Sequence, residues 1–185
     1  MGVPQTVEAL SRADFIAWEN AQVEKHEYVE GEVFAMVGAR RVHVAITLNI
    51  AAKLKDHLRG GPCRAFMADM KLEVKAADAV FYPDVLVTCH ADDLKAETVM
   101  HHPTAIIEVL SESTAAYDRG DKFASYRLIE SLREYALIDP DHRRVEVFRR
   151  MENGDWLLAA SESGQGLILK SREVALGLDA VFEDV

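Results

Sequence analysis

Two carboxylates stand inside apolar segments of this 185-residue chain, where an unpaired charge is costly. Asp84 follows Tyr82-Pro83 and directly precedes Val85-Leu86-Val87, and Glu108 interrupts the apolar run 105–110. An ionised carboxylate buried without a partner needs a cation or several hydrogen bonds, and two on neighbouring strands would repel unless a metal bridged them. Hard oxygen ligands suit Mg²⁺ or Mn²⁺ rather than zinc, so the pattern predicts such an ion here. The alternative is that each carboxylate lies at a strand end, facing water or capping a loop.

A lysine further along the chain could complete this chemistry. Lys122 and Tyr126 are four residues apart and share one face of a predicted helix. If that helix packs back onto the strand that carries Glu108, the Lys122 ammonium would reach a metal-bound water or a scissile phosphate. The alternative is a solvated lysine beside Asp118 or Asp121, because lysine is nearly always exposed.

The elements that position these residues follow from apolar periodicity and turn residues. The N-terminal segment predicts a short helix with Thr6 as its N-cap. Residues 26–36 predict a hairpin about a Glu-Gly turn, and residues 41–58 predict a long helix. Further strands are expected at 63–67, 70–75, 81–87, 105–110, 134–138, 145–149 and 156–160, with a helix at 113–130. Helices at both ends of a strand-rich centre predict an α/β (α+β) fold, and residues 1–185 lack a linker or repeat, so we expect a single domain.

The formal net charge of −10 argues against a nucleic-acid substrate, because proteins that neutralise many phosphates are usually basic. A divalent cation in the predicted metal site would offset part of this charge. Local basic patches could also contact phosphates, and the candidate clusters are 40–41, 53–59, 143–144 and 149–150. The alternative is that these are ordinary solvated surface charges.

Cys63 and Cys89 are too few for a disulfide framework and have no nucleophile context, so we expect ordinary buried cysteines in a reducing cytoplasm. The chain shows neither an N-terminal apolar core of signal-peptide length nor a membrane-spanning run. His101-His102 could suggest zinc, but adjacent histidines point to opposite sides of an extended chain, and no cysteine or third histidine stands at a useful spacing. We expect a polar loop there.

Several short motifs follow one another from about residue 8 to 150. In order they are His26 to Glu32, His43 opening the long helix, Pro83-Asp84, Glu108-Val109-Leu110-Ser111 with Ser113-Thr114, Asp118-Arg119 with Lys122 and Tyr126, and Glu134-Tyr135 with Asp139-Pro140. None is strong alone, but in their joint order and spacing they resemble the Uma2 family (DUF820) of the PD-(D/E)XK nuclease superfamily.

The resemblance implies a restriction-endonuclease-like core, a mixed β-sheet flanked by helices. It also implies that Asp84 and Glu108 bind the metal, that a lysine supports the attacking water, and that Glu27 is an additional acidic residue. His43 and Tyr126 match family positions near the site. The superfamily's lysine stands two residues after the glutamate, where this chain has Leu110, so the resemblance assigns that role to Lys122 on the following helix. Glu112 and Ala136 replace a common proline and a common tryptophan, which are expected to be packing changes.

Three functions remain open at this point. The leading prediction is a Mg²⁺- or Mn²⁺-dependent endonuclease that hydrolyses DNA, with metal-activated water attacking phosphorus. The second is a nuclease fold kept as a binding or assembly module without turnover, which the acidic charge and the displaced lysine favour. The third is a metal-dependent hydrolase of small phosphate esters. Related small nucleases often pair to match the two strands of a duplex, so the resemblance also implies a homodimer.

Overall fold

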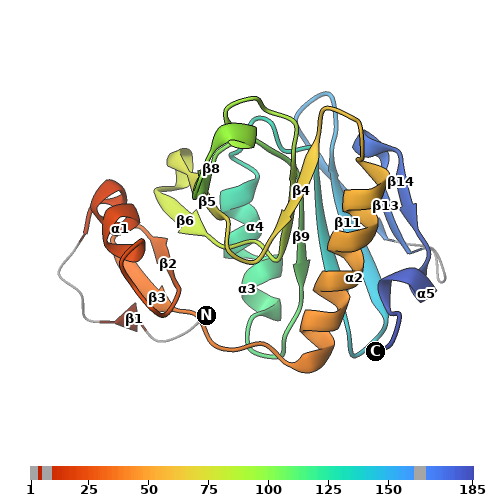
Figure 1. Ribbon diagram of the computed structural model, residues 1–185, viewed down its shortest axis with the longest axis horizontal. Coiled ribbons are helices and arrows are strands. Elements are labelled where there is room, and N and C mark those ends of the chain that lie inside the picture. Colours follow the sequence, from red (N-terminus) through yellow and green to blue (C-terminus); the bar gives the residue numbers. More distant parts are fainter. Residues whose placement is uncertain (1–3, 6–9, 161–165) are drawn as a thin grey trace.

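The computed structural model describes residues 4–5, 10–160 and 166–185, and Figure 1 shows how their elements are arranged. The main sheet has six strands in the order β12-β11-β10-β9-β7-β4. These strands are β4 Arg64–Met67, β7 Val85–Thr88, β9 Pro103–Val109, β10 Glu134–Asp139, β11 Arg144–Arg150 and β12 Trp156–Ala160. The central pair β9 and β10 is parallel and the other neighbours are antiparallel, so the sheet is mixed.

Helices cover both faces of this sheet. Helix α2 (Arg41–His57) lies across one face, and α3 (Ala115–Arg119) with α4 (Asp121–Tyr126) connects β9 to β10 across the other (Figure 1). Because strand side chains alternate between faces, Ala105, Ile107 and Val109 of β9 pack in the core beside α2. Ile106 and Leu110 pack in the core beside α4. The same alternation places Glu108 on the α4 face.

A second, smaller sheet lies beside the first and also has mixed strands, in the order β1-β3-β2-β6-β5-β8. Its strands are β1 Pro4–Gln5, β2 His26–Val29, β3 Glu32–Ala35, β5 Lys71–Val74, β6 Ala79–Phe81 and β8 Val99–Met100, and helix α1 Arg12–Glu19 packs against it. The C-terminal part contains β13 Leu167–Leu169, β14 Val174–Leu176 and α5 Leu178–Val181. Short 3₁₀ turns are η1 Lys75–Ala77, η2 Asp93–Lys95 and η3 Lys170–Arg172. None of the described helices is both long and apolar enough to cross a membrane.

Most predicted elements are present, and the mixed sheet flanked by helices confirms the predicted fold class. The hairpin turn is at Glu30 and Gly31, whose positive φ angles of 47° and 92° suit the twist of a two-residue hairpin loop. The predicted N-cap Thr6 lies outside the described residues. The observed first helix begins at Arg12 instead, where the Ser11 hydroxyl accepts a hydrogen bond from the Asp14 amide.

Two predicted elements are each split in the structure. The run 81–87 is not one strand, because β6 ends at Phe81 in the small sheet and β7 begins at Val85 in the main sheet. Pro83 lies between them and has no N–H to continue a strand ladder. The helix expected at 113–130 is divided at Gly120, whose backbone angles (φ −106°, ψ −101°) are not helical, and it ends at Tyr126.

The expectation of two separate cysteines is wrong, since Cys63 and Cys89 form a disulfide. Cys63 directly precedes β4 and Cys89 directly follows β7, and these strands pair antiparallel with Arg64 opposite Thr88. The pairing brings the two cysteines together although 26 residues separate them. Disulfides are rare in reducing compartments, so the cysteines do not support the predicted cytoplasmic location.

Candidate active site

Strand pairing brings the two unusual carboxylates together. Val85 at the start of β7 pairs with Ile107 of β9, so Asp84 and Glu108 occupy the next opposed positions of the antiparallel pair. The Asp84 amide donates a hydrogen bond of 3.2 Å to Oε2 of Glu108. Glu108 belongs to the face of the sheet that α3 and α4 cover, because it is in phase with Ile106 in that core. Asp84 lies just before β7, at the end of the sheet.

Asp84 is held by a backbone amide and by a histidine of α2. Its Oδ2 accepts a hydrogen bond of 2.8 Å from the Val109 amide and lies 3.1 Å from Nε2 of His43. Burial lowers the pKa of His43, but the hydrogen bond and charge of Asp84 outweigh it and raise this pKa above the usual value. His43 therefore orients the Asp84 carboxylate.

Glu108 is almost fully buried and has protein partners at both oxygens. Its Oε1 lies 3.0 Å from Nζ of Lys122 and accepts a hydrogen bond of 2.9 Å from the Tyr126 hydroxyl. Burial raises the pKa of Glu108 well above its usual range; Lys122 opposes this rise, and the nearby Asp84 adds to it. The pKa of Tyr126 is also raised, first by burial and then by the Glu108 charge, so its hydroxyl remains a donor.

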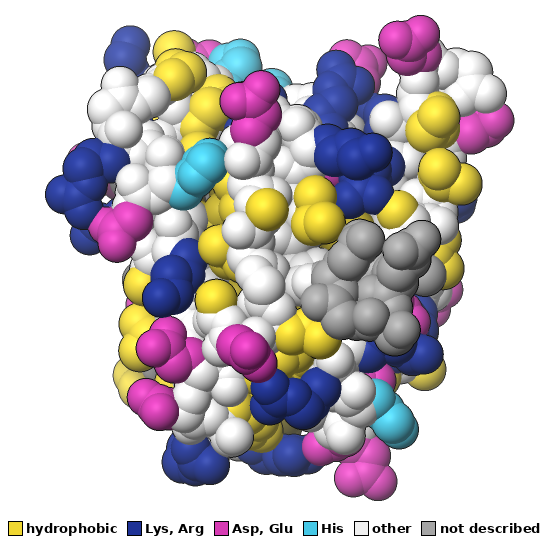
Figure 2. All heavy atoms as spheres, turned by 90° about the vertical axis from the view of Figure 1, so that its right-hand side faces the viewer, with side chains coloured by type: hydrophobic (Ala, Val, Ile, Leu, Met, Phe, Trp, Pro, Cys, Tyr) yellow, Lys and Arg dark blue, Asp and Glu magenta, His cyan; other side chains and the backbone are white. Residues whose placement is uncertain are grey.

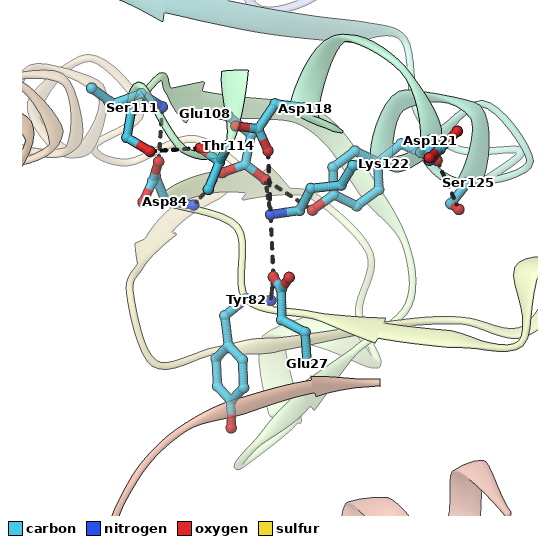
Figure 3. A network of polar contacts seen from close by, with 12 residues as sticks. Glu27, Tyr82, Asp84, Glu108, Ser111, Thr114, Asp118, Asp121, Lys122 and Ser125 are labelled. Atoms are coloured by element: carbon cyan, nitrogen blue, oxygen red, sulfur yellow. Dashed lines mark hydrogen bonds and ion pairs between the residues drawn. The ribbon is translucent and has the colours of Figure 1, made fainter. Parts of the chain in front are cut away.

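The Lys122 ammonium lies among carboxylates from three different elements (Figure 3). Besides Glu108, it lies 3.2 Å from Oε1 of Glu27 on β2 and 3.9 Å from Oδ1 of Asp118 on α3. The Lys122 side chain is 8% exposed, so the alternative of a solvated lysine is wrong. Burial alone would lower the pKa of Lys122, but Glu108 and Glu27 raise it well above the usual value. The ammonium therefore stays protonated.

Glu27 links the small sheet to this cluster. Its Oε1 contacts Lys122 and also accepts a hydrogen bond of 3.2 Å from the Tyr82 amide. Tyr82 belongs to the segment that carries Asp84 from one sheet to the other. The chain passes from the small sheet to the main sheet between β6 and β7. As a result, Glu27 of the small sheet and Glu108 of the main sheet both contact the Lys122 ammonium.

Asp118 belongs to the site, although the sequence predicted no role for it beyond a place beside Lys122 and in the same motif. It is buried, and burial raises its pKa while the Lys122 charge opposes this rise. The signal was available, because Asp118 precedes Lys122 by four residues in a segment predicted to be helical. Its burial was not visible in the sequence, because the covering segments lie far away along the chain.

The cluster opens into a pocket of about 730 Å³. Five of the six predicted site residues, Glu27, His43, Asp84, Glu108 and Lys122, line it together with Asp118. The sixth, Tyr126, lies behind Glu108 and contacts it through its hydroxyl. The structure thus gathers all six predicted residues into one site.

The donor set fits a hard divalent cation. The contacts described for Asp84 involve Oδ2, so its Oδ1 retains acceptor capacity, and Oε2 of Glu108 accepts one backbone hydrogen bond. Glu27, Asp84, Glu108 and Asp118 supply four carboxyl groups against the single lysine Lys122. Their mutual repulsion is one reason why the pKa values of Glu108 and Asp118 are raised, and a cation would relieve it.

The histidine prediction needs one correction. His101 and His102 do point to different partners, as expected, since Nδ1 of His101 lies 3.2 Å from Glu73. However, His102 does have possible co-ligands. His90 and Asp93 place ligand atoms within 4.8 Å of it and of each other. The sequence spacing did not indicate this group, because His90 and Asp93 follow β7 whereas His102 directly precedes β9.

The fold is that of a restriction-endonuclease-like nuclease. It is similar to the crystal structure of "a putative nuclease belonging to DUF820" from Anabaena variabilis, with a TM-score of 0.76, 17% sequence identity, and coverage of 94% of this chain and 97% of that chain. The family model of Uma2, described as "Putative restriction endonuclease", matches residues 12–180. The chain therefore belongs to the Uma2 family, which confirms the resemblance seen in its motifs.

Two proteins from Synechocystis sp., both described as uncharacterized, are also similar. One is 34% identical over 173 residues, which cover 94% of this chain and 91% of the relative. The other is 33% identical over 160 residues, covering 85% and 90%. Both alignments extend over most of this chain and most of each relative.

Proposed function

We propose that the protein is a Mg²⁺-dependent endonuclease that hydrolyses phosphodiester bonds in DNA, with Mn²⁺ able to replace Mg²⁺. The observation that carries this proposal is the buried Lys122 ammonium, 3.0 Å from Glu108 at the edge of a pocket that also contains Asp84. A buried cation beside paired carboxylates matches the needs of phosphoryl transfer, which depends on positioning and on stabilising negative charge.

The proposed roles follow from the contacts. Asp84 and Glu108 would hold the metal, and a bound Mg²⁺ would supply an activated water and offset charge on the phosphate. Lys122 would orient the attacking water and stabilise the negative charge that develops on the phosphoryl oxygens as the new P–O bond forms and the ester P–O bond breaks. His43 holds the Asp84 carboxylate, and Tyr126 holds the Glu108 carboxylate, so neither needs to contact the substrate.

Charge makes the metal a condition for substrate binding. The pocket lining includes five carboxyl groups, those of Glu27, Asp84, Glu108, Glu112 and Asp118, and a phosphodiester is itself an anion. Arg40 lines the pocket but is paired with Asp141. Basic side chains outside the pocket are also paired, for example Lys53 with Glu183 and Arg59 with Asp56. On the face viewed in Figure 2, basic and acidic side chains are interspersed and do not form one basic surface. We therefore infer that the substrate phosphate binds mainly through the metal and Lys122.

The decisive experiment is cleavage of plasmid and single-stranded DNA with Mg²⁺, with Mn²⁺ and with EDTA. Wild-type protein should cut only with metal, whereas Asp84→Asn and Lys122→Met should not cut. Lys53→Met, which removes an exposed lysine of α2, is the matched control and should cut normally. Equal cleavage by Lys122→Met and wild type would refute the proposal.

Two other functions each have one supporting observation. The net charge of −10 favours a binding or assembly module without turnover, which would bind Mg²⁺ but leave DNA intact. The pocket volume of about 730 Å³ is within the range of small-molecule sites, which favours a hydrolase of small phosphate esters. Hydrolysis of an aryl phosphodiester without cleavage of DNA would favour the second of these functions.

Three further proposals concern the whole protein. We propose that residues 1–185 form one domain and that it is located in the cytoplasm, although the disulfide speaks against that location. We also propose a homodimer that pairs through β12, the edge strand of the main sheet, where Leu157 is 54% exposed. Strand β11 is paired on both sides and does not offer its backbone for such a contact. Light scattering that finds only a monomer at micromolar concentration would exclude the dimer.

A further inference from the structure

Three potential metal ligands meet at the end of the main sheet opposite to the candidate active site. His90 follows β7, Asp93 lies in η2, and His102 directly precedes β9. One ligand atom of each residue lies within 4.8 Å of the other two. Six residues of chain separate His90 from Asp84, and at about 3.3 Å per extended residue this places the group roughly 15–20 Å from the carboxylate pair. The group is therefore separate from the site described above.

Asp93 is held as metal-binding carboxylates usually are. It is 1% exposed, and its two oxygens accept three hydrogen bonds. Oδ2 accepts from the Thr88 hydroxyl at 2.9 Å and from the His102 amide at 2.8 Å, and Oδ1 accepts from the His101 amide at 2.9 Å. Each carboxylate oxygen has two lone pairs, so Oδ1 can still accept one ligand. Such fixed outer partners orient a ligand for a cation.

The two imidazoles are close together and one of them is open to solvent. The ring centroids of His90 and His102 are 4.0 Å apart, with a tilt of 33° between the planes. The His90 side chain is 45% exposed, so an ion can reach the group and water can complete its coordination. Tetrahedral zinc needs nitrogen ligands roughly 3.3 Å apart. His90 is the exposed member of the group, so its side chain has room to move toward that spacing when an ion binds.

We propose that His90, Asp93 and His102 form a second metal site that binds Zn²⁺ or a similar transition-metal ion. Two nitrogen donors and one carboxylate suit such ions, whereas Mg²⁺ prefers oxygen ligands. The ion would connect the loop after β7 to the first residues of β9, so its role is to stabilise this end of the sheet. The proposal uses no residue of the candidate active site and does not depend on the proposed function.

Zinc titration by calorimetry, on protein without an affinity tag, tests the site. Wild-type protein should bind one Zn²⁺ here, and its thermal midpoint should rise with Zn²⁺. His90→Ala and His102→Ala should each weaken this binding by at least about tenfold. His90 is exposed, so its replacement should leave the fold intact. His57→Ala is the matched control, because His57 is also exposed and contacts the backbone carbonyl of Arg172, away from this group.

A second comparison separates this site from the carboxylate site. Asp84→Asn should retain the Zn²⁺ binding of the wild type and its dependence on His90. Binding that is lost in Asp84→Asn but unchanged in His90→Ala and His102→Ala would place the zinc in the candidate active site and overturn the proposal. Absence of Zn²⁺ binding to the wild type at concentrations well above micromolar would also overturn it.

Discussion

Replacing Lys122 with methionine should destabilise the metal-free protein and strengthen its binding of Mg²⁺. The side chain is 8% exposed and lies 3.0 Å from Glu108 and 3.2 Å from Glu27, so its removal leaves buried carboxylates without their cation. Removing one partner of a buried ion pair costs about 3–5 kcal/mol. Because the pKa of Glu108 is already raised and rises further without Lys122, this carboxyl can stay neutral, and we expect a cost near the lower end, about 3 kcal/mol.

Denaturant and thermal unfolding measure this cost, with EDTA and then with Mg²⁺. For a protein of this size, about 3 kcal/mol corresponds to a fall in Tm of roughly 6–12 °C. With Mg²⁺ the difference from wild type should shrink, because the ion replaces the lost positive charge and stabilises the folded state by mass action. Calorimetry should show Mg²⁺ affinity equal to or higher than that of the wild type, since a competing cation has been removed.

A control variant and a double variant separate the loss of the buried ion pair from other effects of the substitution. Lys53→Met removes an exposed lysine that pairs with Glu183 and should change stability by no more than about 0.5 kcal/mol. Glu27→Gln combined with Lys122→Met should cost less than the sum of the two single changes, because the pair couples directly. An unchanged unfolding curve for Lys122→Met in EDTA would refute the buried ion pair and the reasoning built on it.

Three further outcomes are expected. Asp84→Asn should weaken Mg²⁺ binding strongly in calorimetry while metal-free stability stays equal or rises, because one of several crowded charges is lost; if this variant unfolds, Asp84 is structural. Lys122→Ala should lower turnover by about two orders of magnitude or more, and Lys122→Arg should restore little in the same cleavage assay, because a guanidinium fork is shaped differently from an ammonium. The pKa of Glu108 is raised in the folded state, so between the usual carboxyl pKa and this raised pKa the folded state holds a proton that the unfolded state has lost. The metal-free stability should therefore fall as the pH rises through this range. The slope is at most about 1.4 kcal/mol per pH unit for one group. Denaturation at several pH values should show a smaller slope for Glu108→Gln.

Local patterns in the sequence were enough to predict most of the elements. The hairpin at 26–36, the helix at 41–58 and the strand at 105–110 each have a periodicity and end signals that tertiary contacts do not override. The motif order was enough to predict the family and the fold class. These features depend on residues close together in the chain, which is why they could be predicted.

Features that depend on distant pairing could not be predicted. The run 81–87 is apolar apart from Asp84, and only the sheet order shows that it changes sheets at Tyr82-Pro83-Asp84. The disulfide arises from the pairing of β4 with β7, and the group of His90, Asp93 and His102 arises from two loop ends brought together by β7 and β9. The residue type of Lys122 also favoured a wrong expectation, because lysines are generally exposed and this one is buried.

The superfamily's lysine would stand two residues after Glu108, where this chain has Leu110. Lys122 of α4 supplies an ammonium at the carboxylates instead. Residues 108 and 110 of an extended chain point to the same face, and here that face is covered by α4. Leu110 packs in the core with Phe123 and Tyr126 of α4, which fixes the helix over Glu108. Leu110 therefore helps to position the Lys122 ammonium, although its own side chain is apolar. It follows that the site depends on the packing of α4, so shortening Leu110 to alanine should reduce Lys122-dependent activity as well as stability.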